Sequence, residues 1–326
     1  MGLRIVAAVH DPPVWTMPPA DVARLQRDLP DDDVIDVRTP EDRRREFPHA
    51  DVLLAYGVTT EEAGLLGRAR WIQSTAVGVD FLLKPSIVAG PIVITNARGC
   101  HAEFIAEHAI AMMLALRRYL HVAAARQRDQ AWAQEELQRL PAPPIAGTAI
   151  LVAGLGEIGR RVARMAAGLG CHVIGLRRRI DQPMPEGVRE IVTIDRLRDA
   201  LPRVRAVIVA MPPTSATTAM LGAEELAALP DGAIVVNVAR ASLIDEAAFL
   251  AELERGRLAA GLDVFAREPL AAGHRFWTLP NVLITPHTAA FGDDYWAPAI
   301  ELFKDNLRRF KAGEPLVNVV DKVQGY

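Results

Sequence analysis

The chain has 326 residues, which at roughly 100–200 residues per domain predicts two domains, and half of its residues are hydrophobic, which excludes a disordered chain. The 37 Lys and Arg against 40 Asp and Glu give a net charge of −3, which excludes binding to nucleic acid or an anionic membrane through bulk positive charge. The two cysteines, Cys100 and Cys171, are too few for a disulfide framework and lack the spacing of a zinc site, so we expect a cytoplasmic protein without a metal.

The chain begins with MGLRIVAAVH, a short apolar stretch that predicts a strand and not a signal peptide, because no small-residue cleavage pattern follows it. The longest apolar run, 105–116, contains Glu107 and His108 and is shorter than the roughly 20 residues of a membrane helix. We therefore expect no membrane span.

Short runs rich in Val and Ile alternate with helical patterns, which predicts an α/β fold with parallel sheets. Five such runs in the first third predict a small open sheet of flavodoxin-like type: 3–9, 34–37, 51–56, 71–75 and 92–96. Six more predict a doubly wound, Rossmann-type sheet: 149–153, 172–176, 206–211, 233–238, 259–264 and 282–285.

Two helical patterns flank the second series of strands. The first, from about His101 to Gln130, is apolar, is longer than one sheet crossover requires, and ends before the proline-rich stretch 141–144. The second, 295–312, follows the last strand of a complete sheet, so we expect it to pack back on the first domain. The expected organisation is a discontinuous domain, 1–98 with 289–326, and an inserted domain, 99–288, joined by two chain crossings that form a hinge.

A glycine-rich turn joins the strand 149–153 to a helical pattern. In this context the sequence GLGEIG matches G-x-G-x-x-G, whose glycines permit a tight turn, let a pyrophosphate approach the backbone, and let helix and strand pack closely. The motif predicts a dinucleotide site. The contacts expected from this turn are Gly154, Gly156, Glu157, Ile158 and Gly159.

Three arginines, Arg177, Arg178 and Arg179, follow the next strand, and the first acidic residue after them is Asp181. An acid at this strand end bonds the ribose 2′-OH of NAD, whereas guanidinium groups fit the 2′-phosphate of NADP. We therefore predict NADP, with NAD as the second choice. The alternative is that these arginines form a solvated loop.

Three ionisable side chains, Arg240, Glu268 and His287, follow the last three predicted strands in turn. Open parallel sheets bind their ligands at the carboxyl ends of the strands. We therefore expect a cation, a carboxylate and an imidazole at one edge of the sheet; for Arg240 alone, a surface salt bridge is the alternative.

Over nearly its whole length the chain resembles the D-isomer-specific 2-hydroxyacid dehydrogenases, the family of D-lactate, glyoxylate/hydroxypyruvate and phosphoglycerate dehydrogenases. The motifs that carry the resemblance are STAVGVD (74–80), AEH (106–108), GLGEIG (154–159), NVARASLIDE (237–246), GLDVFAREPL (261–270) and TPHTAA (285–290). The resemblance implies an oxidoreductase that transfers a hydride between NADP(H) and a small 2-keto or D-2-hydroxy acid of the glyoxylate or hydroxypyruvate type.

The resemblance also implies a role for each ionisable residue: Arg240 binds the substrate carboxylate and carbonyl, His287 is the acid/base, and Glu268 orients and charges the imidazole. The chemistry agrees, because reduction of a keto acid needs a proton at the carbonyl oxygen and imidazole is protonated near neutrality. A carboxylate that is hydrogen-bonded to the ring nitrogen facing away from the substrate favours the imidazolium.

Further contacts are implied in the same way. The loop of Ala76, Val77 and Gly78 would present backbone N–H groups to the substrate carboxylate, and Asp263 would face the nicotinamide ribose or carboxamide. The other implied cofactor contacts are Met211, Pro212, Thr217, Val238, Ala239, Arg240, His287 and Ala289. The family's long helix packs against its twin, so we predict a homodimer, with intramolecular burial of the helix as the alternative.

The sequence departs from the family pattern at Ala241, where glycine is common, and after His287, where Thr-Ala-Ala-Phe replaces Ile-Gly. Val77 stands where phosphite dehydrogenases carry lysine, and Glu268 where formate dehydrogenases carry glutamine. Two alternatives stay open: a non-enzymatic, dinucleotide-sensing corepressor-like protein, and an NAD-dependent phosphoglycerate or phosphite dehydrogenase relative. The sequence does not identify the physiological keto acid.

Overall fold

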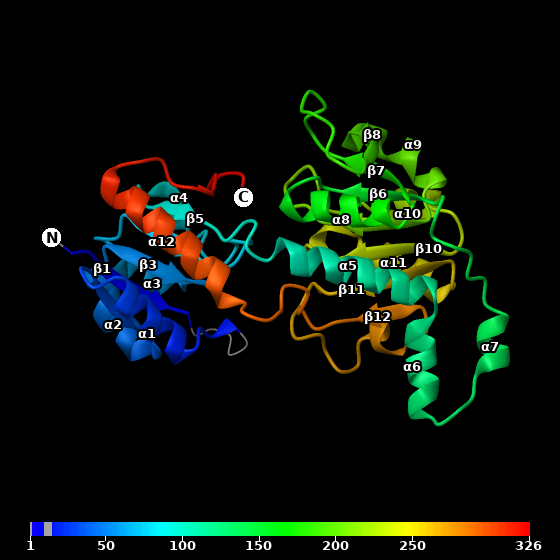
Figure 1. The fold of residues 1–326 in the computed structure, drawn as a ribbon, viewed down its shortest axis with the longest axis horizontal. Coiled ribbons are helices and arrows are strands. Elements are labelled where there is room, and N and C mark those ends of the chain that lie inside the picture. Colours follow the sequence, from blue (N-terminus) through cyan, green and yellow to red (C-terminus); the bar gives the residue numbers. More distant parts are fainter. Residues whose placement is uncertain (1, 10–14) are drawn as a thin grey trace. The chain divides into compact units, whose positions relative to one another are not determined.

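The computed structural model describes residues 2–9 and 15–326 and contains two compact α/β units, shown in Figure 1. Unit 1 comprises residues 1–101 and 292–326, and unit 2 comprises residues 102–291. Each unit is built on its own parallel sheet, as the predicted fold class requires. The two junctions lie a few residues later in the chain than the predicted boundaries.

Unit 1 has a five-stranded parallel sheet in the order β2-β1-β3-β4-β5, which is the flavodoxin-like order. Each strand corresponds to a predicted one: β1 (Arg4–Ala8), β2 (Asp33–Asp36), β3 (Val52–Ala55), β4 (Trp71–Ser74) and β5 (Val93–Thr95). Successive side chains of a strand point to opposite faces, so Ile5 and Val6 of β1 enter two different hydrophobic clusters. Both faces of the sheet are therefore covered.

Helices from both ends of the chain cover the faces of this sheet. On one face, Leu25 of α1 (Pro19–Asp28) packs in the same cluster as Phe303 of α12 (Trp296–Ala312). The C-terminal helix thus belongs to unit 1. The remaining elements lie along the other face or its edge: α2 (Pro40–Glu46), η2 (Phe47–His49), α3 (Thr60–Leu65) and α4 (Pro85–Ala89).

Unit 2 has a seven-stranded parallel sheet in the order β12-β11-β10-β9-β6-β7-β8. Counted from β6, this is the Rossmann order 3-2-1-4-5-6 with one more strand beyond. The strands are β6 (Ala149–Ala153), β7 (His172–Leu176), β8 (Val188–Val192), β9 (Ala206–Val209), β10 (Ala233–Asn237), β11 (Leu258–Leu262) and β12 (Val282–Ile284).

The prediction of six strands in this sheet was wrong, because β8 was missed. Its sequence, VREIV, has no continuous apolar run, and Arg189 is exposed because β8 is an edge strand. The strands that precede Arg240, Glu268 and His287 are consequently the fifth, sixth and seventh of the sheet.

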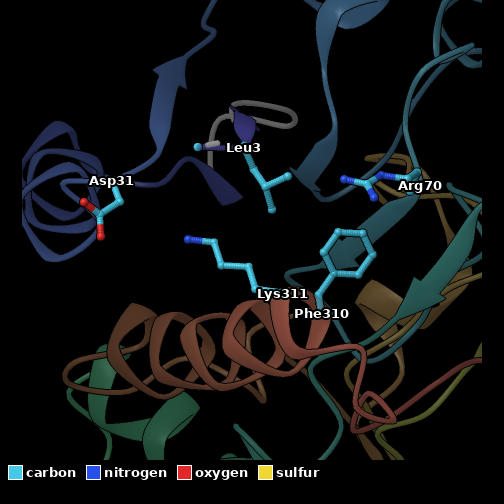
Figure 2. Close-up of a pocket in the computed structure, with 6 residues that line it drawn as sticks. Leu3, Asp31, Arg70, Phe310 and Lys311 are labelled. Atoms are coloured by element: carbon cyan, nitrogen blue, oxygen red, sulfur yellow. The ribbon is translucent and has the colours of Figure 1, made fainter.

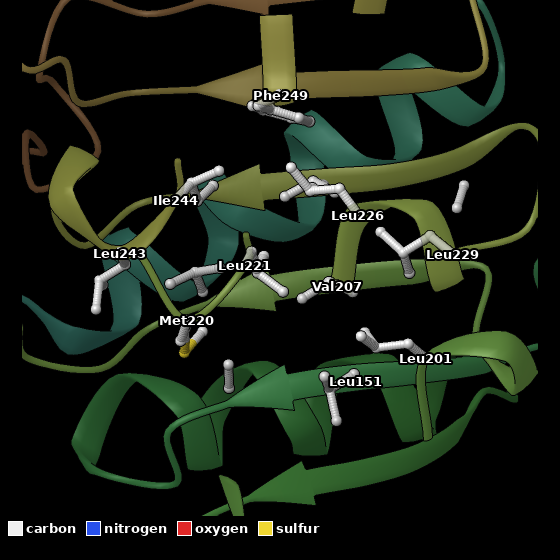
Figure 3. Close-up of a cluster of buried hydrophobic side chains, with 14 of the residues drawn as sticks. Leu151, Leu201, Val207, Met220, Leu221, Leu226, Leu229, Leu243, Ile244 and Phe249 are labelled. Atoms are coloured by element: carbon white, nitrogen blue, oxygen red, sulfur yellow. The ribbon is translucent and has the colours of Figure 1, made fainter. Parts of the chain in front are cut away.

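Two hydrophobic layers enclose the sheet of unit 2. Helices α5 (Ala102–Arg117) and α8 (Glu157–Gly168) cover one face. On the other face, Leu226 and Phe249 belong to one hydrophobic cluster with strand residues such as Val207 (Figure 3). The helical elements associated with this second layer are η3 (Ile194–Arg196), α9 (Leu197–Ala200), η4 (Leu201–Arg203), α10 (Ala223–Ala228), η5 (Ala241–Leu243), α11 (Glu246–Glu254) and η6 (Arg275–Thr278).

The long helix predicted from His101 to Gln130 is broken, so that prediction was also wrong. Helix α5 ends at Arg117, Tyr119 takes a left-handed conformation with φ 54°, and α6 (Leu120–Arg128) and the short α7 (Gln134–Gln138) follow. The returning proline-rich segment fixes the break, because the Tyr119 hydroxyl donates to the Pro141 carbonyl at 3.1 Å.

Candidate active site

The glycine-rich turn joins β6 to α8, and its glycines are required for different reasons. Gly154 has φ 97°, and a Cβ there would lie 2.6 Å from the Ala210 carbonyl oxygen. A Cβ on Gly159 would lie 1.7 Å from the Gly154 carbonyl oxygen, so the helix can approach the strand only without a side chain. Gly154 therefore lets the turn lie close to the segment after β9, and Gly159 lets α8 pack closely on the turn and on β6.

Gly156, the N-cap of α8, faces open space instead, because a Cβ built there would meet no atom within 4 Å. The first N–H groups of a helix have no partner within the helix and lie at the positive end of its dipole. The Glu157 carboxylate, which would oppose an anion here, is paired with Arg161 at 2.8 Å. The turn therefore fits a dinucleotide pyrophosphate.

The three arginines after β7 differ in their surroundings. Arg177 is half-buried and its guanidinium donates to the backbone carbonyls of Gln182 and Pro183, the latter at 3.0 Å. Arg178 and Arg179 are exposed. The Arg177 side chain therefore stabilises its own loop, and the exposed Arg178 and Arg179 are more accessible to a ligand.

Arg240 is carried on a tight turn after β10 that is stabilised by the buried side chain of Asn237. The Asn237 amide donates to the Arg240 carbonyl at 2.9 Å and its oxygen accepts the Ala239 N–H at 3.0 Å. The half-buried Arg240 guanidinium donates to the Ala239 carbonyl at 2.8 Å. Asn237 was not among the predicted site residues, although asparagine at a strand end is a common sign of such a turn.

His287 and Glu268 form a close pair: His287 Nδ1 and Glu268 Oε2 lie 2.6 Å apart. The other carboxylate oxygen of Glu268 accepts the Phe265 N–H at 2.9 Å. Burial raises the pKa of Glu268, but the hydrogen bonds from His287 and Phe265 and the charges of His287 and Arg240 outweigh burial, and the resulting pKa is lower than usual. Glu268 is thus an ionised carboxylate that contacts the imidazole of His287 at Nδ1.

The side chains of Asp263 and Thr285 build the turn that carries His287. The Asp263 carboxylate is buried and accepts the Thr285 hydroxyl at 2.6 Å, together with the N–H groups of Thr288 and Ala289. His287 has φ 55°, and its own N–H donates to the Asp263 carbonyl at 2.9 Å. In this structure Asp263 therefore shapes the His287 turn.

His108 of α5 continues this network, because its Nε2 lies 2.9 Å from the Thr285 hydroxyl oxygen. The hydroxyl donates its single hydrogen to Asp263, so it accepts from His108. His108 was not among the predicted site residues and entered only as part of the AEH motif. A contact between residues 177 positions apart leaves no local signal in the sequence.

The other predicted cofactor residues also follow the carboxyl ends of strands in the unit 2 sheet, but their side chains differ in burial. Thr217 is buried, and its hydroxyl donates to the Pro212 carbonyl at 3.1 Å, which shapes the loop after β9. Met211 is half-buried and Pro212 is exposed. The side chains of Val238 and Ala289 are buried in the layer under α5, whereas Ala239 is half-buried.

The predicted substrate loop, Ala76 to Gly78, follows β4 in unit 1 and is half-buried. The Ala76 N–H donates to the Ser74 hydroxyl at 3.1 Å. Within residues 2–9 and 15–326, no acceptor bonds the N–H of Val77 or Gly78. Two of the three predicted donors are thus available.

A hollow of about 620 Å³ in unit 1 contains none of the predicted residues (Figure 2). Its two cations already have partners: the Arg70 guanidinium lies 4.9 Å from the centre of the Phe310 ring, and Lys311 is paired with Asp32. Across the described chain, no cluster of three or more His, Cys, Asp or Glu is arranged to hold a metal, and no helix is both long and apolar enough to cross a membrane.

Comparison with known proteins gives consistent matches. The family model for the NAD-binding domain of D-isomer specific 2-hydroxyacid dehydrogenases matches residues 110–289. A D-3-phosphoglycerate dehydrogenase of Mycobacterium bovis is 32% identical over 84% of this chain and 52% of that protein. The chain therefore spans about half the length of this relative.

Solved structures are similar over nearly the whole chain, among them the following two. A D-isomer specific 2-hydroxyacid dehydrogenase of Xanthobacter autotrophicus, in complex with NADPH and MES, has a TM-score of 0.85 at 27% identity and covers 100% of both chains. An NADPH-dependent glyoxylate/hydroxypyruvate reductase of Sinorhizobium meliloti, in complex with NADP and sulfate, has a TM-score of 0.85 at 26% identity, covering 99% of this chain and 100% of that one.

Proposed function

The chain belongs to the D-isomer-specific 2-hydroxyacid dehydrogenase family, and on that premise we propose that it transfers a hydride between NADP(H) and a small 2-keto or D-2-hydroxy acid of the glyoxylate or hydroxypyruvate type. The observation that carries the proposal is the 2.6 Å pair of His287 and Glu268, with the positive charge of Arg240 acting on the same carboxylate. A histidine held in this way suits proton transfer to a carbonyl oxygen.

In this proposal His287 supplies the proton from Nε2, because Nδ1 is bonded to Glu268. The ionised Glu268 fixes the ring and stabilises the imidazolium. A bound reduced nicotinamide supplies the hydride to the carbonyl carbon. The Arg240 guanidinium binds and polarises the substrate in this proposal and transfers no proton.

The residues proposed to hold the cofactor are the turn Gly154–Gly159 and the arginines after β7. The open space at Gly156 and the N–H groups that begin α8 support the turn as the pyrophosphate site. The exposure of Arg178 and Arg179 supports these two as the 2′-phosphate contacts, with Arg177 shaping the loop. The proposed substrate contacts in unit 1 are the Val77 and Gly78 N–H groups.

Replacement of both Arg178 and Arg179 by alanine is expected to weaken NADPH binding and to leave NADH binding nearly unchanged, because only NADPH carries the 2′-phosphate. Loss of one charge-assisted contact costs roughly 1.5–3 kcal/mol, or about one to two decades in affinity. Titration of the protein with each dinucleotide at low salt measures both constants.

Arg189→Ala is the matched control, because Arg189 is an exposed arginine on the neighbouring strand β8. It should leave both constants as they are. If the unmodified protein binds NADH as tightly as NADPH, the arginines form only a solvated surface and the proposed NADP preference is wrong.

A homodimer is also proposed, because α6 buries none of its residues in the single chain. Leu120 at the start of α6 is 56% exposed and Trp132 is 90% exposed, so these two large apolar side chains lack a cover in the single chain. Light scattering at micromolar concentration is expected to give twice the mass of one chain. A mass near that of one chain would leave the segment uncovered and exclude the dimer.

The similarity to phosphoglycerate dehydrogenases makes a phosphorylated 2-keto acid the second candidate substrate. A panel of glyoxylate, hydroxypyruvate and 3-phosphohydroxypyruvate, each with NADPH and with NADH, tests the substrate and the cofactor together. The proposal predicts the highest kcat/KM for an unphosphorylated acid with NADPH.

A further inference from the structure

The loop after β4 is held through its carbonyl groups. The Ala76 carbonyl accepts the Ala97 N–H at 3.0 Å, and the Val77 carbonyl accepts the side-chain amide of Asn96 at 2.8 Å. Both donors belong to the segment that follows β5. Two successive carbonyls of the loop are thus turned toward the same segment.

This arrangement fixes the direction of the next two N–H groups. In a trans peptide the carbonyl and the N–H point in opposite directions. The Val77 N–H and the Gly78 N–H are therefore directed away from Asn96 and Ala97, and both lack an acceptor among the residues that the structure describes. Successive N–H groups that point one way can bind an anion such as a carboxylate.

Asn96 controls one of these donors through its side chain. The residue is 3% exposed, and its amide oxygen accepts the Arg98 N–H at 3.3 Å, which leaves the amide nitrogen to bond the Val77 carbonyl. The peptide between Val77 and Gly78 is therefore held by the Asn96 side chain, whereas the preceding peptide is held by the Ala97 N–H and by the Ser74 hydroxyl, which donates to the Ala76 carbonyl at 3.1 Å. A substitution at Asn96 can therefore turn the Val77–Gly78 peptide without removing the hydrogen bonds that hold the Ala76–Val77 peptide.

The C-terminal segment holds Asn96 from the other side. Asn318, with φ 60°, accepts the Asn96 N–H on its carbonyl at 3.1 Å, and its side-chain amide donates to the carbonyls of Asn96 and Arg98 at 3.3 and 2.8 Å. Val320 extends the pairing, because its N–H donates to the Ile94 carbonyl at 2.9 Å.

We infer that Asn96 is a positioning residue that directs the Gly78 N–H toward the substrate carboxylate, and that Asn318 keeps Asn96 in place. The inference rests on the proposed function, which makes this loop the carboxylate site. It assigns a role in substrate affinity to a segment near the end of the chain.

Asn96→Asp tests the inference, because the shape of the side chain is kept while a carboxylate oxygen replaces the amide that faces the Val77 carbonyl. Repulsion between the two oxygens should turn the peptide and misdirect the Gly78 N–H. We expect KM for glyoxylate and the Kd for oxalate, a carboxylate ligand measured by titration calorimetry, to rise on the order of 10-fold to 100-fold. The Kd for NADPH should stay the same and kcat should change less than KM.

Asn318→Gly is the second variant, since glycine keeps the left-handed backbone and removes the side-chain bonds. A smaller rise in the same two constants is expected. Asn281→Asp is the matched control, because the Asn281 amide also donates to two backbone carbonyls, those of Leu253 and Leu258, but belongs to unit 2. Its KM and oxalate Kd should equal those of the unmodified protein.

A folded Asn96→Asp protein with an unchanged oxalate Kd would overturn the inference. If that variant does not fold, an unchanged Kd in Asn318→Gly overturns it instead. Failure of the proposed function looks different: the unmodified protein then reduces no 2-keto acid, while the oxalate affinities of the variants still decide the role of Asn96. Absence of oxalate binding to the unmodified protein contradicts both.

Discussion

Replacement of His287 by alanine is expected to lower kcat for keto-acid reduction on the order of 10²–10⁴-fold, the usual effect of losing one general acid. The physical reason is that the imidazole, held 2.6 Å from Glu268, has no substitute as a proton donor in the proposed mechanism. The Kd for NADPH should change little, because His287 is proposed to act on the substrate. Steady-state kinetics and dinucleotide titration on the same preparation measure the two effects separately.

His274→Ala is the control for this variant. His274 also belongs to unit 2 and pairs with a carboxylate, that of Glu246 at 3.4 Å, but it lies at η6 and has no proposed contact with substrate. It should leave kcat within a small factor of the unmodified value. A His287→Ala protein with near-normal turnover on its best keto acid would show that the acid has been assigned to the wrong residue.

Replacement of Gly159 by alanine is expected to abolish tight dinucleotide binding and to destabilise unit 2. The added Cβ would lie 1.7 Å from the Gly154 carbonyl oxygen, so α8 or the turn must shift. Overpacking of this kind costs about 1–3 kcal/mol and occasionally more. The shift also displaces the N–H groups that are proposed to bind the pyrophosphate. Thermal unfolding and NADPH titration should both respond.

Gly168→Ala separates the clash from a general effect of alanine in α8. Gly168 lies in the same helix, but a Cβ there meets no atom within 4 Å, and alanine favours a helix over glycine. This variant should bind NADPH normally and be at least as stable as the unmodified protein. If Gly159→Ala behaves in the same way, the helix tolerates a side chain and the close approach of α8 is not required for binding.

The elements that carry the proposed chemistry could be predicted because their signals are local. The backbone geometry of Gly154 and Gly159 makes explicit why the turn needs these two glycines, and Gly156 leaves open space at the start of α8. The residues after β10, β11 and β12 could be placed at one edge because parallel strands bring their carboxyl ends together. The pair of His287 and Glu268 follows from that placement.

The features that were missed depend on the position of a strand at a sheet edge or on hydrogen-bond partners that no residue pattern specifies. Strand β8 lies at the edge of its sheet and lacks an apolar run. The break at Tyr119 depends on hydrogen bonds to the proline-rich segment that returns along the helix end. The orientation of Arg177 depends on carbonyls of its own loop, and the contribution of His108 depends on Thr285. None of these partners is visible in a local pattern.

The polar residues that support the site were missed for a related reason. Asn237, Asn96 and Asn318 act through hydrogen bonds to backbone groups, and such bonds depend on the exact course of the chain rather than on residue type. Asp263 was predicted as a cofactor contact, and the structure places its carboxylate on the turn of His287. A sequence can suggest that a polar residue matters without indicating which group it holds.

The most direct test of the proposed function adds glyoxylate or hydroxypyruvate to the purified protein with NADPH. The oxidation of NADPH is measured as the loss of its absorbance. Saturable turnover is expected for the unmodified protein, and almost none for His287→Ala at equal NADPH occupancy. A protein that binds NADPH tightly and yet oxidises it with no 2-keto acid of the panel would contradict the proposed enzyme and favour a dinucleotide-binding protein without catalysis.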